Sequence, residues 1–256
     1  MNVTRLTRRV AGRLVSGLAR LLSARSALPC RYASLWLRGA LEKEMGWLDR
    51  IVRPTGIAID IGANMGLYSY RLGQLCLGVE AFEPNPGPRA VLEAYGRRNI
   101  RIHSVALSSA EGNAKLYIPV LHGREQTGFA TLQSKPMREY VELDVVTRRL
   151  DSYNFTNVCL IKIDVEGHEL DVLRGALATV RTNRPVLLIE LEERHQSLPI
   201  QIIFDWIRSL GYNGFFVLHG DLEPISHFDV EQHQRAYLHG QLQASYINNF
   251  FFMPSD

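Results

Sequence analysis

The sequence predicts an α/β fold, in which a doubly wound and mainly parallel sheet carries helices on both faces. From residue 57 onward, short apolar runs alternate with stretches of helical periodicity, and several of the apolar runs end in turns rich in Gly, Asp or Glu. Strands that alternate with helices form βαβ units, and these units build parallel sheets. A length of 256 residues favours one large domain over two small ones.

The first half of the predicted sheet lies between residues 57 and 107. Strands are expected at 57–61, 78–82 and 100–107, and helices at 67–76 and 89–98. The turn at 83–87 reads Glu-Pro-Asn-Pro-Gly, a composition typical of a chain reversal. These elements form two successive strand–helix–strand units.

The second half continues the alternation after an interruption. Strands are expected at 158–163 and 186–191, helices at 169–180 and 199–210, and closing strands at 215–218 and 249–253. Residues 112–150 interrupt the alternation of strands and helices, and extra strands are expected at 116–118 and 141–146. The intervening segment 119–139 is rich in Gly, Thr, Ser and Gln. Because long irregular insertions in compact domains are usually functional, we interpret 119–139 as a substrate-side insertion.

Composition and charge narrow the classes of function. The chain is 46% hydrophobic and 21% charged, which excludes a disordered chain. Its three cysteines form no CxxC pair, which excludes a zinc ribbon and favours a reducing compartment. Residues 1–40 contain eight arginines and no acidic residue, so the rest of the chain holds 21 of the 29 basic residues against all 26 acidic ones. A net acidic body argues against nucleic acid as a partner.

Residues 1–45 form a predicted helical arm, distinct from the domain at 46–256. Leucine and valine recur at helical spacing and arginines lie between them, which is the pattern of a basic amphipathic helix. The arginines interrupt every apolar run, so this segment is not a membrane span. Three interpretations stay open: a helix packed on the domain or on a second subunit, a peripheral contact with an anionic membrane surface, and a transit peptide. We expect a cytoplasmic protein, with or without peripheral contact to the inner face of a membrane.

The turn after the first strand has the features of a ligand site. It contains Asp60, Gly62, Asn64 and Gly66, and opens the helix at 67–76. Glycine allows a tight turn close to a ligand, and the helix N-terminus offers free N–H groups to an anion. A dinucleotide and S-adenosylmethionine are both candidates. The G-x-G-x-x-G pattern of dinucleotide sites is missing, and Asp60 would repel a pyrophosphate but suit the ammonium group of a methionine moiety.

Glu83 ends the second predicted strand, about 20 residues after the first turn. An acid at this position can accept hydrogen bonds from both ribose hydroxyls of either ligand. The simpler interpretation is a solvated loop carboxylate. Position and spacing together favour the ligand-binding role.

A second cluster of titratable groups follows the strand at 158–163. Asp164, Glu166 and His168 lie within five residues, and the carboxyl ends of parallel strands share one edge of the sheet. These groups could act on a substrate hydroxyl, and Asp164 and Glu166 could hold a divalent cation. The alternative is that a carboxylate only caps the next helix. Glu190 ends the following strand at the same edge, whereas a solvated loop is the simpler interpretation of Glu192, Glu193 and His195.

Several segments, taken together, resemble the FkbM family of S-adenosylmethionine-dependent methyltransferases. The matching segments are DIGANMGLYS at 60–69, FEPNP at 82–86, VAL at 105–107, VTRRLD at 146–151, LIKIDVEGHE at 160–169 and PVLLIE at 185–190, with GFATL at 128–132 less distinct. They follow the family's order, and their combination is specific although no single segment is. Met65 departs from the family pattern, which often has a β-branched aliphatic residue there.

The resemblance implies a Rossmann-like class I methyltransferase fold, with a seven-stranded sheet whose last strand is antiparallel. It implies S-adenosylmethionine as the cofactor and O-methylation of a sugar hydroxyl in a glycolipid, polysaccharide or glycosylated natural product. By this resemblance the methionine part would be held by the 60–66 turn and the ribose by Glu83. The complete set of implied cofactor-binding residues is Asp60, Gly62, Ala63, Asn64, Gly66, Glu83, Pro84, Asn85, Val105 and Ala106.

The expected reaction is in-line transfer of a methyl group to the hydroxyl of a small-molecule or glycan acceptor. Asp164 or Glu166 would be the base or a metal ligand, and His168 and Glu190 would contact the substrate or act as alternative bases. A divalent cation would lower the pKa of the hydroxyl. Two other functions stay open: a nicotinamide-dependent oxidoreductase, which the missing G-x-G-x-x-G disfavours, and a scaffold that binds ligand without catalysis.

Overall fold

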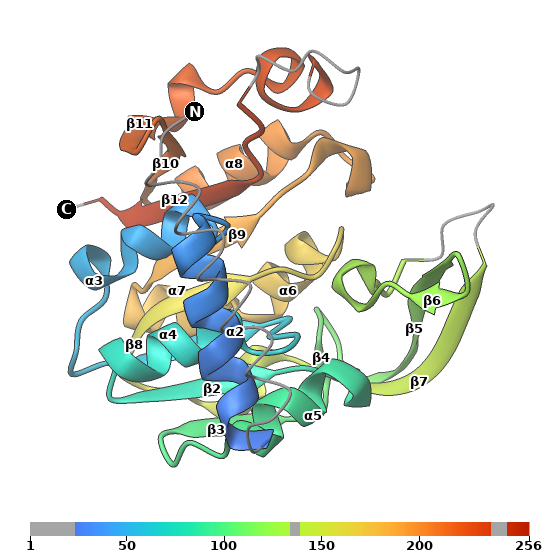
Figure 1. The fold of residues 1–256 in the computed structure, drawn as a ribbon. Coiled ribbons are helices and arrows are strands. Elements are labelled where there is room, and N and C mark those ends of the chain that lie inside the picture. The colour runs from blue at the N-terminus through green and yellow to red at the C-terminus, as the bar shows by residue number, and fades with distance from the viewer. Residues whose placement is uncertain (1–23, 134–138, 237–244, 256) are drawn as a thin grey trace, which may run out of the picture.

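A computed structural model describes residues 24–133, 139–236 and 245–255 of the chain. Within these residues the main sheet has eight strands in the order β11-β10-β12-β9-β8-β1-β2-β3 (Figure 1). Their bounds are Ile57–Ile61 for β1, Gly78–Phe82 for β2, Ile100–His103 for β3, Val158–Ile163 for β8, Val186–Glu190 for β9, Tyr212–Leu218 for β10, Asp221–Pro224 for β11 and Asn249–Pro254 for β12.

The topology confirms the predicted fold. Strands β3, β2, β1, β8 and β9 pair in parallel, and β12 lies between β9 and β10 and is antiparallel to both. The predicted reversed strand is therefore β12. β11 adds an eighth strand at the edge through a two-residue loop, His219-Gly220, in which both residues have positive φ. Such a loop matches the right-handed twist of a hairpin.

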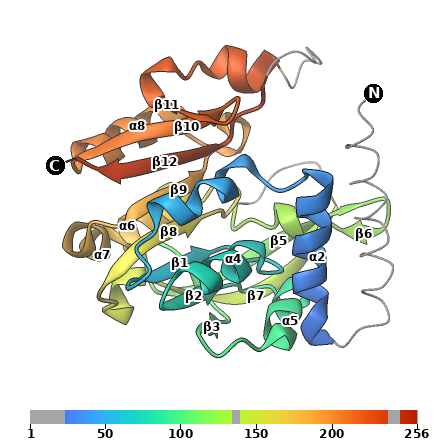
Figure 2. The same cartoon turned by 60° about the vertical axis from the view of Figure 1, so that its left-hand side comes forward.

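Helices cover both faces of this sheet (Figure 2). Their bounds are Ala24–Arg38 for α2, Leu48–Ile51 for α3, Leu67–Leu75 for α4, Pro86–Tyr95 for α5, Glu169–Gly175 for α6, Leu177–Asn183 for α7 and Ile200–Ser209 for α8. Alternate residues of a strand face opposite ways, so Phe250 and Phe252 pack on the α8 side while Phe251 packs on the α4 side. All three are fully buried, which places an apolar core on each face.

A smaller second sheet forms an arm beside the main one. It has the order β4-β7-β5-β6, with bounds Ala106–Leu107, Tyr140–Arg148, Gly112–Leu121 and Arg124–Glu125. The prediction of one strand at 100–107 is therefore wrong. β2 ends at Phe82, which is opposite His103, so the chain beyond His103 has no partner in the main sheet. Ala106 and Leu107 pair instead with β7.

The predicted helix at 169–180 is also two helices, α6 and α7, which meet at Ala176. Gly175 lies so close to the backbone carbonyl of Ser108 that a Cβ there would overlap it. The end of α6 is thus in close contact with the chain that leads into the smaller sheet, and the helix ends there.

The helix α2 packs against α4 and α5, as both views show (Figures 1 and 2). Leu28 is completely buried there, and Tyr32 contacts Tyr70 with ring centroids 4.9 Å apart. Of the predicted N-terminal helix at residues 1–45, residues 1–23 lie outside the described residues. Among the helices that the structure describes, none is long and apolar enough to cross a membrane.

The turns after β1 and β8 are in direct backbone contact. Asp164 N donates a hydrogen bond to Ile61 O at 3.0 Å, and Gly62 has a φ of +76°. A Cβ at Gly62 would overlap the carbonyl oxygen of Asp164. Only glycine meets both requirements, a left-handed backbone and close approach.

Replacing Gly62 with alanine should cost at least about 2 kcal/mol more unfolding free energy than replacing Gly123 with alanine. Gly123 has a φ of +70° but no atom within 4 Å of its Cβ position, so it reports the backbone strain alone. Urea denaturation of both variants measures the difference. Equal losses would mean that the two turns do not pack as described.

Candidate functional site

One pocket lies at the carboxyl ends of the central strands, closed on one side by the arm. It encloses about 600 Å³, including the part open to solvent. Nine residues predicted for the site line it: Gly62, Asn64, Glu83, Pro84, Val105, Ala106, Asp164, Glu166 and His168. A pocket of this size at this edge is where ligands bind in doubly wound sheets.

The Glu83 carboxylate is held in place at the end of β2. Its Oε2 accepts a hydrogen bond from Asn64 N at 2.8 Å, and its Oε1 accepts one from Asn85 N at 2.7 Å. Burial raises the pKa of Glu83 to about 7, although both backbone hydrogen bonds oppose the rise. Each oxygen keeps a second lone pair, so the carboxylate can still accept two hydroxyl groups. This geometry contradicts the interpretation of Glu83 as a solvated loop carboxylate.

Asn64 occupies a left-handed backbone conformation with a φ of +49°. This conformation turns its side chain into the pocket lining. Its Oδ1 is buried and has no hydrogen-bond partner among the described residues, and the same holds for Nδ2 of Asn85. Buried polar atoms are normally satisfied, so Oδ1 of Asn64, which lines the pocket, has capacity for a ligand. Arg89 fixes the adjoining turn by donating to the carbonyl oxygens of Glu83 and Pro84.

Five predicted residues do not line the pocket: Asp60, Ala63, Gly66, Asn85 and Glu190. Asp60 faces α4, where its carboxylate accepts a hydrogen bond from Ser69 Oγ at 2.5 Å. Burial raises the pKa of Asp60 to about 6, and the Ser69 hydrogen bond lowers it in part. Gly66 has a φ of +87° and lies at the N-terminus of α4, against Leu92. Asp60 and Gly66 therefore support the turn from the side that faces α4 and not from the pocket.

The remaining walls of the pocket are mainly apolar. Val105, Ala106 and Leu116 come from the arm and the chain that leads into it, and Phe82 comes from β2. Part of the predicted 119–139 insertion closes the pocket from the arm side, through residues 127, 128 and 130–132. Residues 134–138 of that insertion lie outside the described residues. Such a cleft suits a flat, largely apolar ring.

The turn after β8 carries the acidic side of the pocket. Asp164 Oδ2 lies 3.1 Å from Lys162 Nζ, and the Lys162 side chain is only 2% exposed. Burial lowers the pKa of Lys162, but its acidic neighbours, Asp164 first and then Glu190, Glu42 and Asp60, outweigh this effect and raise it. The ammonium group therefore stays charged among these four carboxyl groups.

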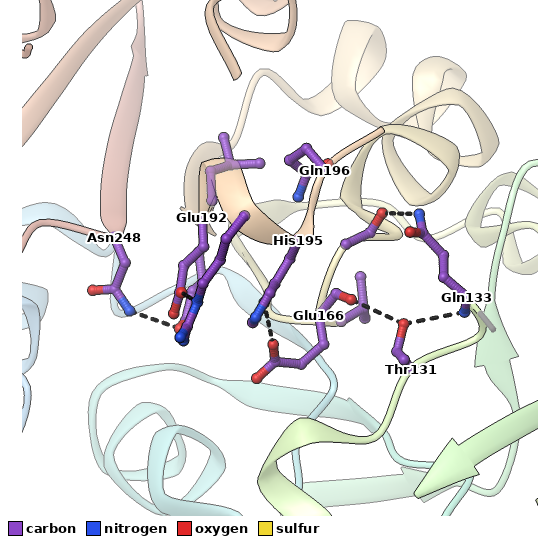
Figure 3. Close-up of polar contacts among 12 residues, drawn as sticks. Thr131, Gln133, Glu166, Glu192, His195, Gln196 and Asn248 are labelled. Atoms are coloured by element: carbon purple, nitrogen blue, oxygen red, sulfur yellow. Dashed lines mark hydrogen bonds and ion pairs between the residues drawn. The ribbon is translucent and has the colours of Figure 1, made fainter. Parts of the chain in front are cut away.

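Glu166 pairs with His195 from the loop after β9. Their side chains meet with Glu166 Oε2 2.6 Å from His195 Nδ1, and both are nearly buried (Figure 3). Glu192 is also buried, with 6% exposure, and accepts a hydrogen bond from Tyr246. The interpretation of Glu192, Glu193 and His195 as a solvated loop is thus wrong for two of the three. The His195 side chain is shielded because η5, Glu193–His195, lies over the turn after β8.

His168 and Glu190 have different neighbours. His168 Nε2 lies 2.9 Å from Ser108 Oγ, and burial lowers the pKa of the imidazole although Asp171 opposes this. Glu190 accepts a hydrogen bond from Asn248 Nδ2 at 2.7 Å. Burial and the charge of Asp164 raise the pKa of Glu190 to about 10, while Lys162 opposes the rise. At neutral pH Glu190 is therefore a neutral acid and not a base.

The predicted metal ligands already have side-chain partners within the protein. Asp164 pairs with Lys162, and Glu166 pairs with His195. Within the part of the chain that the structure describes, no group of three or more His, Cys, Asp or Glu side chains is arranged around a common point for a metal ion. The divalent cation stays a prediction.

Chemically, the pocket combines three environments. Glu83 offers hydrogen-bond acceptors, the arm offers apolar walls, and the turn after β8 offers negative charge and imidazole groups. Sequence reasoning found the first and the last because each follows a strand. It missed Lys162, Arg89 and the pairing of His195 with Glu166, for which no local pattern exists.

Comparison with known proteins identifies relatives of this arrangement. The FkbM methyltransferase domain matches residues 60–213. "Methyltransferase 1" of Beauveria bassiana (strain ARSEF 2860) is 27% identical over 145 residues, which is 46% of this chain and 57% of the relative.

Two solved structures are also similar. The FkbM methyltransferase of Methylobacillus flagellatus KT is 17% identical with a TM-score of 0.49, and the match covers 96% of this chain and 59% of that one. SMU.1697c of Streptococcus mutans, solved in complex with SAH, is 10% identical with a TM-score of 0.43, and the match covers 82% of this chain and 95% of that one. The chain thus spans less than two thirds of the fungal relative and of the Methylobacillus protein.

Replacing Lys162 with methionine should destabilise the fold by roughly 3–5 kcal/mol, because it leaves buried carboxylates without their cation. The loss should be smaller at pH 5 than at pH 8, since protonation removes the uncompensated charge. Urea denaturation at both pH values measures it. Lys115→Met, which removes an exposed partner of Asp144, is the matched control and should change nothing measurable. A loss independent of pH would contradict the electrostatic cause.

Proposed function

The chain belongs to the FkbM methyltransferase family, and on this premise we propose that it transfers the methyl group of S-adenosylmethionine to a hydroxyl oxygen of a sugar-containing acceptor. The observation that supports the cofactor most directly is the Glu83 carboxylate, fixed by two backbone N–H groups at the end of β2. Membership of this methyltransferase family argues against the alternative of a nicotinamide-dependent oxidoreductase.

The described residues fit this cofactor. Glu83 would accept the ribose hydroxyls, and the unpartnered Oδ1 of Asn64 would accept a further donor of the ligand. Val105 and Ala106, with the apolar residues of the arm, would enclose the adenine ring. Asp164, which also lines the pocket, would bring negative charge near the positively charged sulfonium.

When bound, S-adenosylmethionine supplies an electrophilic methyl group on a sulfonium that leaves as a neutral thioether. The protein then has two tasks: to hold the acceptor oxygen in line with the methyl group, and to remove one proton from it. Alignment alone can supply several kcal/mol of barrier reduction, up to about 7–11. The carboxyl and imidazole groups after β8 and β9 stand at the edge where the acceptor would enter.

The lining of the pocket supports a neutral, hydroxyl-bearing acceptor. Its described charged or titratable members are Glu83, Asp164, Glu166 and His168, and it includes neither lysine nor arginine. Anionic groups such as phosphates are normally bound by arginine or lysine. Carboxylates and imidazoles instead suit sugar hydroxyls, which donate hydrogen bonds.

Binding of S-adenosylmethionine should strengthen about tenfold from pH 6 to pH 8. The pKa of Glu83 is about 7, and only the ionised carboxylate accepts two hydroxyl hydrogen bonds. Glu83→Gln should bind at least about tenfold more weakly at pH 8 and lose most of this pH dependence. Isothermal calorimetry measures both. Glu223→Gln, on the edge strand β11, is the control that should behave as wild type. Affinity that rises as the pH falls would contradict this role.

Methyl transfer should be detectable from methyl-labelled S-adenosylmethionine to a mixture of the methyl glycosides of glucose, mannose and rhamnose. The product should be a methyl ether, whose label resists mild base, whereas a methyl ester would release it. Glu83→Gln is the control and should transfer little label. Label that is lost in base would be a methyl ester on the protein itself, because none of these glycosides carries a carboxyl group. An enzyme that binds the cofactor but labels no glycoside would contradict the sugar hydroxyl.

A further inference from the structure

The pair formed by Glu166 and His195 joins the turn after β8 to the loop after β9, at the side of the candidate pocket. Glu166 lines the pocket, whereas His195 comes from η5 and contacts Glu166 from outside the lining residues. The distance from Glu166 Oε2 to His195 Nδ1 is 2.6 Å, and the two side chains are 11% and 13% exposed. Figure 3 shows the His195 ring pointing toward the Glu166 carboxylate.

From this geometry we infer that His195, oriented by Glu166, takes the proton from the acceptor hydroxyl during methyl transfer. The inference rests on the proposed function and specifies its base. A carboxylate that receives Nδ1–H fixes the tautomer of an imidazole and leaves Nε2 with a free lone pair. Among the described residues, Nε2 of His195 has no protein hydrogen-bond partner, and the side chain keeps some exposure.

The backbone around Glu166 is built to present this carboxylate. Glu166 has a φ of +55°, a conformation that costs a non-glycine residue about 1 kcal/mol or more. Thr131 Oγ1 holds it by donating to Glu166 O at 2.9 Å (Figure 3). A glycine would adopt this conformation without strain, but it would lack the carboxylate. Strain of this kind concentrates at functional sites.

The neighbouring residue locks the two loops together. Gly167 has a φ of +105°, and a Cβ there would overlap the carbonyl oxygen of His195. Glu169 accepts a hydrogen bond from Gly167 N at 3.0 Å and one from Gln196 Nε2 at 2.6 Å. The positions of Glu166 and His195 are therefore set by contacts on both sides of the pair.

The other candidate bases are engaged differently. Asp164 Oδ2 lies 3.1 Å from the buried ammonium of Lys162, so this oxygen already has a partner. Glu190 is protonated at neutral pH because its pKa is about 10. His168 Nε2 lies 2.9 Å from Ser108 Oγ, so this nitrogen already has a partner. His195 is the imidazole with a carboxylate to stabilise its charged form and an unoccupied nitrogen.

In the proposed step, one proton and one methyl group are transferred. His195 Nε2 takes the proton of the acceptor O–H, the oxygen lone pair forms the new O–C bond, and the S–C bond breaks with its electron pair retained by sulfur, which becomes neutral. Glu166 stabilises the imidazolium that results. The proton then passes from His195 to solvent.

The tautomer can be measured without any acceptor. In ¹⁵N-labelled protein, long-range imidazole NMR should find His195 mainly as the Nδ1–H form, and Glu166→Leu should remove this bias. His195→Gln assigns the signal. A wild-type His195 that is mainly Nε2–H would overturn the proposal, because that nitrogen would have no lone pair for the acceptor proton.

The second measurement is turnover, with the labelled cofactor and the glycoside mixture as probes. His195→Ala should lower kcat by roughly 10²–10⁴-fold, and added imidazole should restore part of it. Glu166→Gln should also lower kcat, and both variants should keep the wild-type affinity for S-adenosylmethionine. His227→Ala is the matched control, since His227 also has its Nδ1 on a glutamate, 3.0 Å from Glu223, but on the surface. It should keep full activity.

The possible failures are distinguishable. If wild type binds no S-adenosylmethionine or labels no glycoside, the proposed function fails, and the tautomer still decides on the pair. If wild type transfers methyl groups and His195→Ala does so equally well, His195 is not the base. A loss of kcat in His195→Ala that imidazole does not restore, together with a weakened cofactor affinity, would assign the pair a purely structural role.

Discussion

The site depends on one backbone contact, the approach of Gly62 to the carbonyl oxygen of Asp164. β1 and β8 are neighbours in the sheet, so their turns leave the same edge side by side. Because Gly62 has no side chain, the ligand-binding turn and the acidic turn meet without a gap, and Asp164 N bonds to Ile61 O. In the proposed function, a cofactor held by the first turn would lie next to the groups of the second turn, and the sheet would fix the distance between them.

Buried charge imposes a second constraint beneath this contact. Lys162 is enclosed by β8 and α4, with its ammonium 5.0 Å from the centroid of the Tyr68 ring and 3.1 Å from Asp164. Burying a single unpaired charge costs much folding free energy, so Lys162 and its acidic neighbours are stable only when all of them are present. The cation permits acidic groups on β1, β8 and β9 to lie near one another at the same edge. Asp60 does not line the pocket. It acts on the site indirectly, because its carboxyl group helps to keep Lys162 charged and is itself held by Ser69.

The sequence predicts those parts of the structure that local patterns determine. Apolar runs bounded by turns located β1, β2, β8 and β9, and the strand-end rule located Glu83 and Glu166. What it could not predict depends on partners distant in the chain. Strand β4 leaves the main sheet because β7 receives it, and His195 turns inward because Glu166 lies beneath it. Both contacts join segments about 30 or more residues apart, which periodicity does not report.

Two residues of the pocket lining, Asn64 and Glu166, keep left-handed backbones where glycine would be less strained. Each of the two supplies a polar group that glycine would lack: Asn64 an unpartnered buried oxygen, Glu166 a carboxylate paired with His195. Their strain is therefore best explained by what their side chains do. In the proposed function Asn64 would contact the cofactor and Glu166 would orient the base, so both strained positions would serve the proposed transfer.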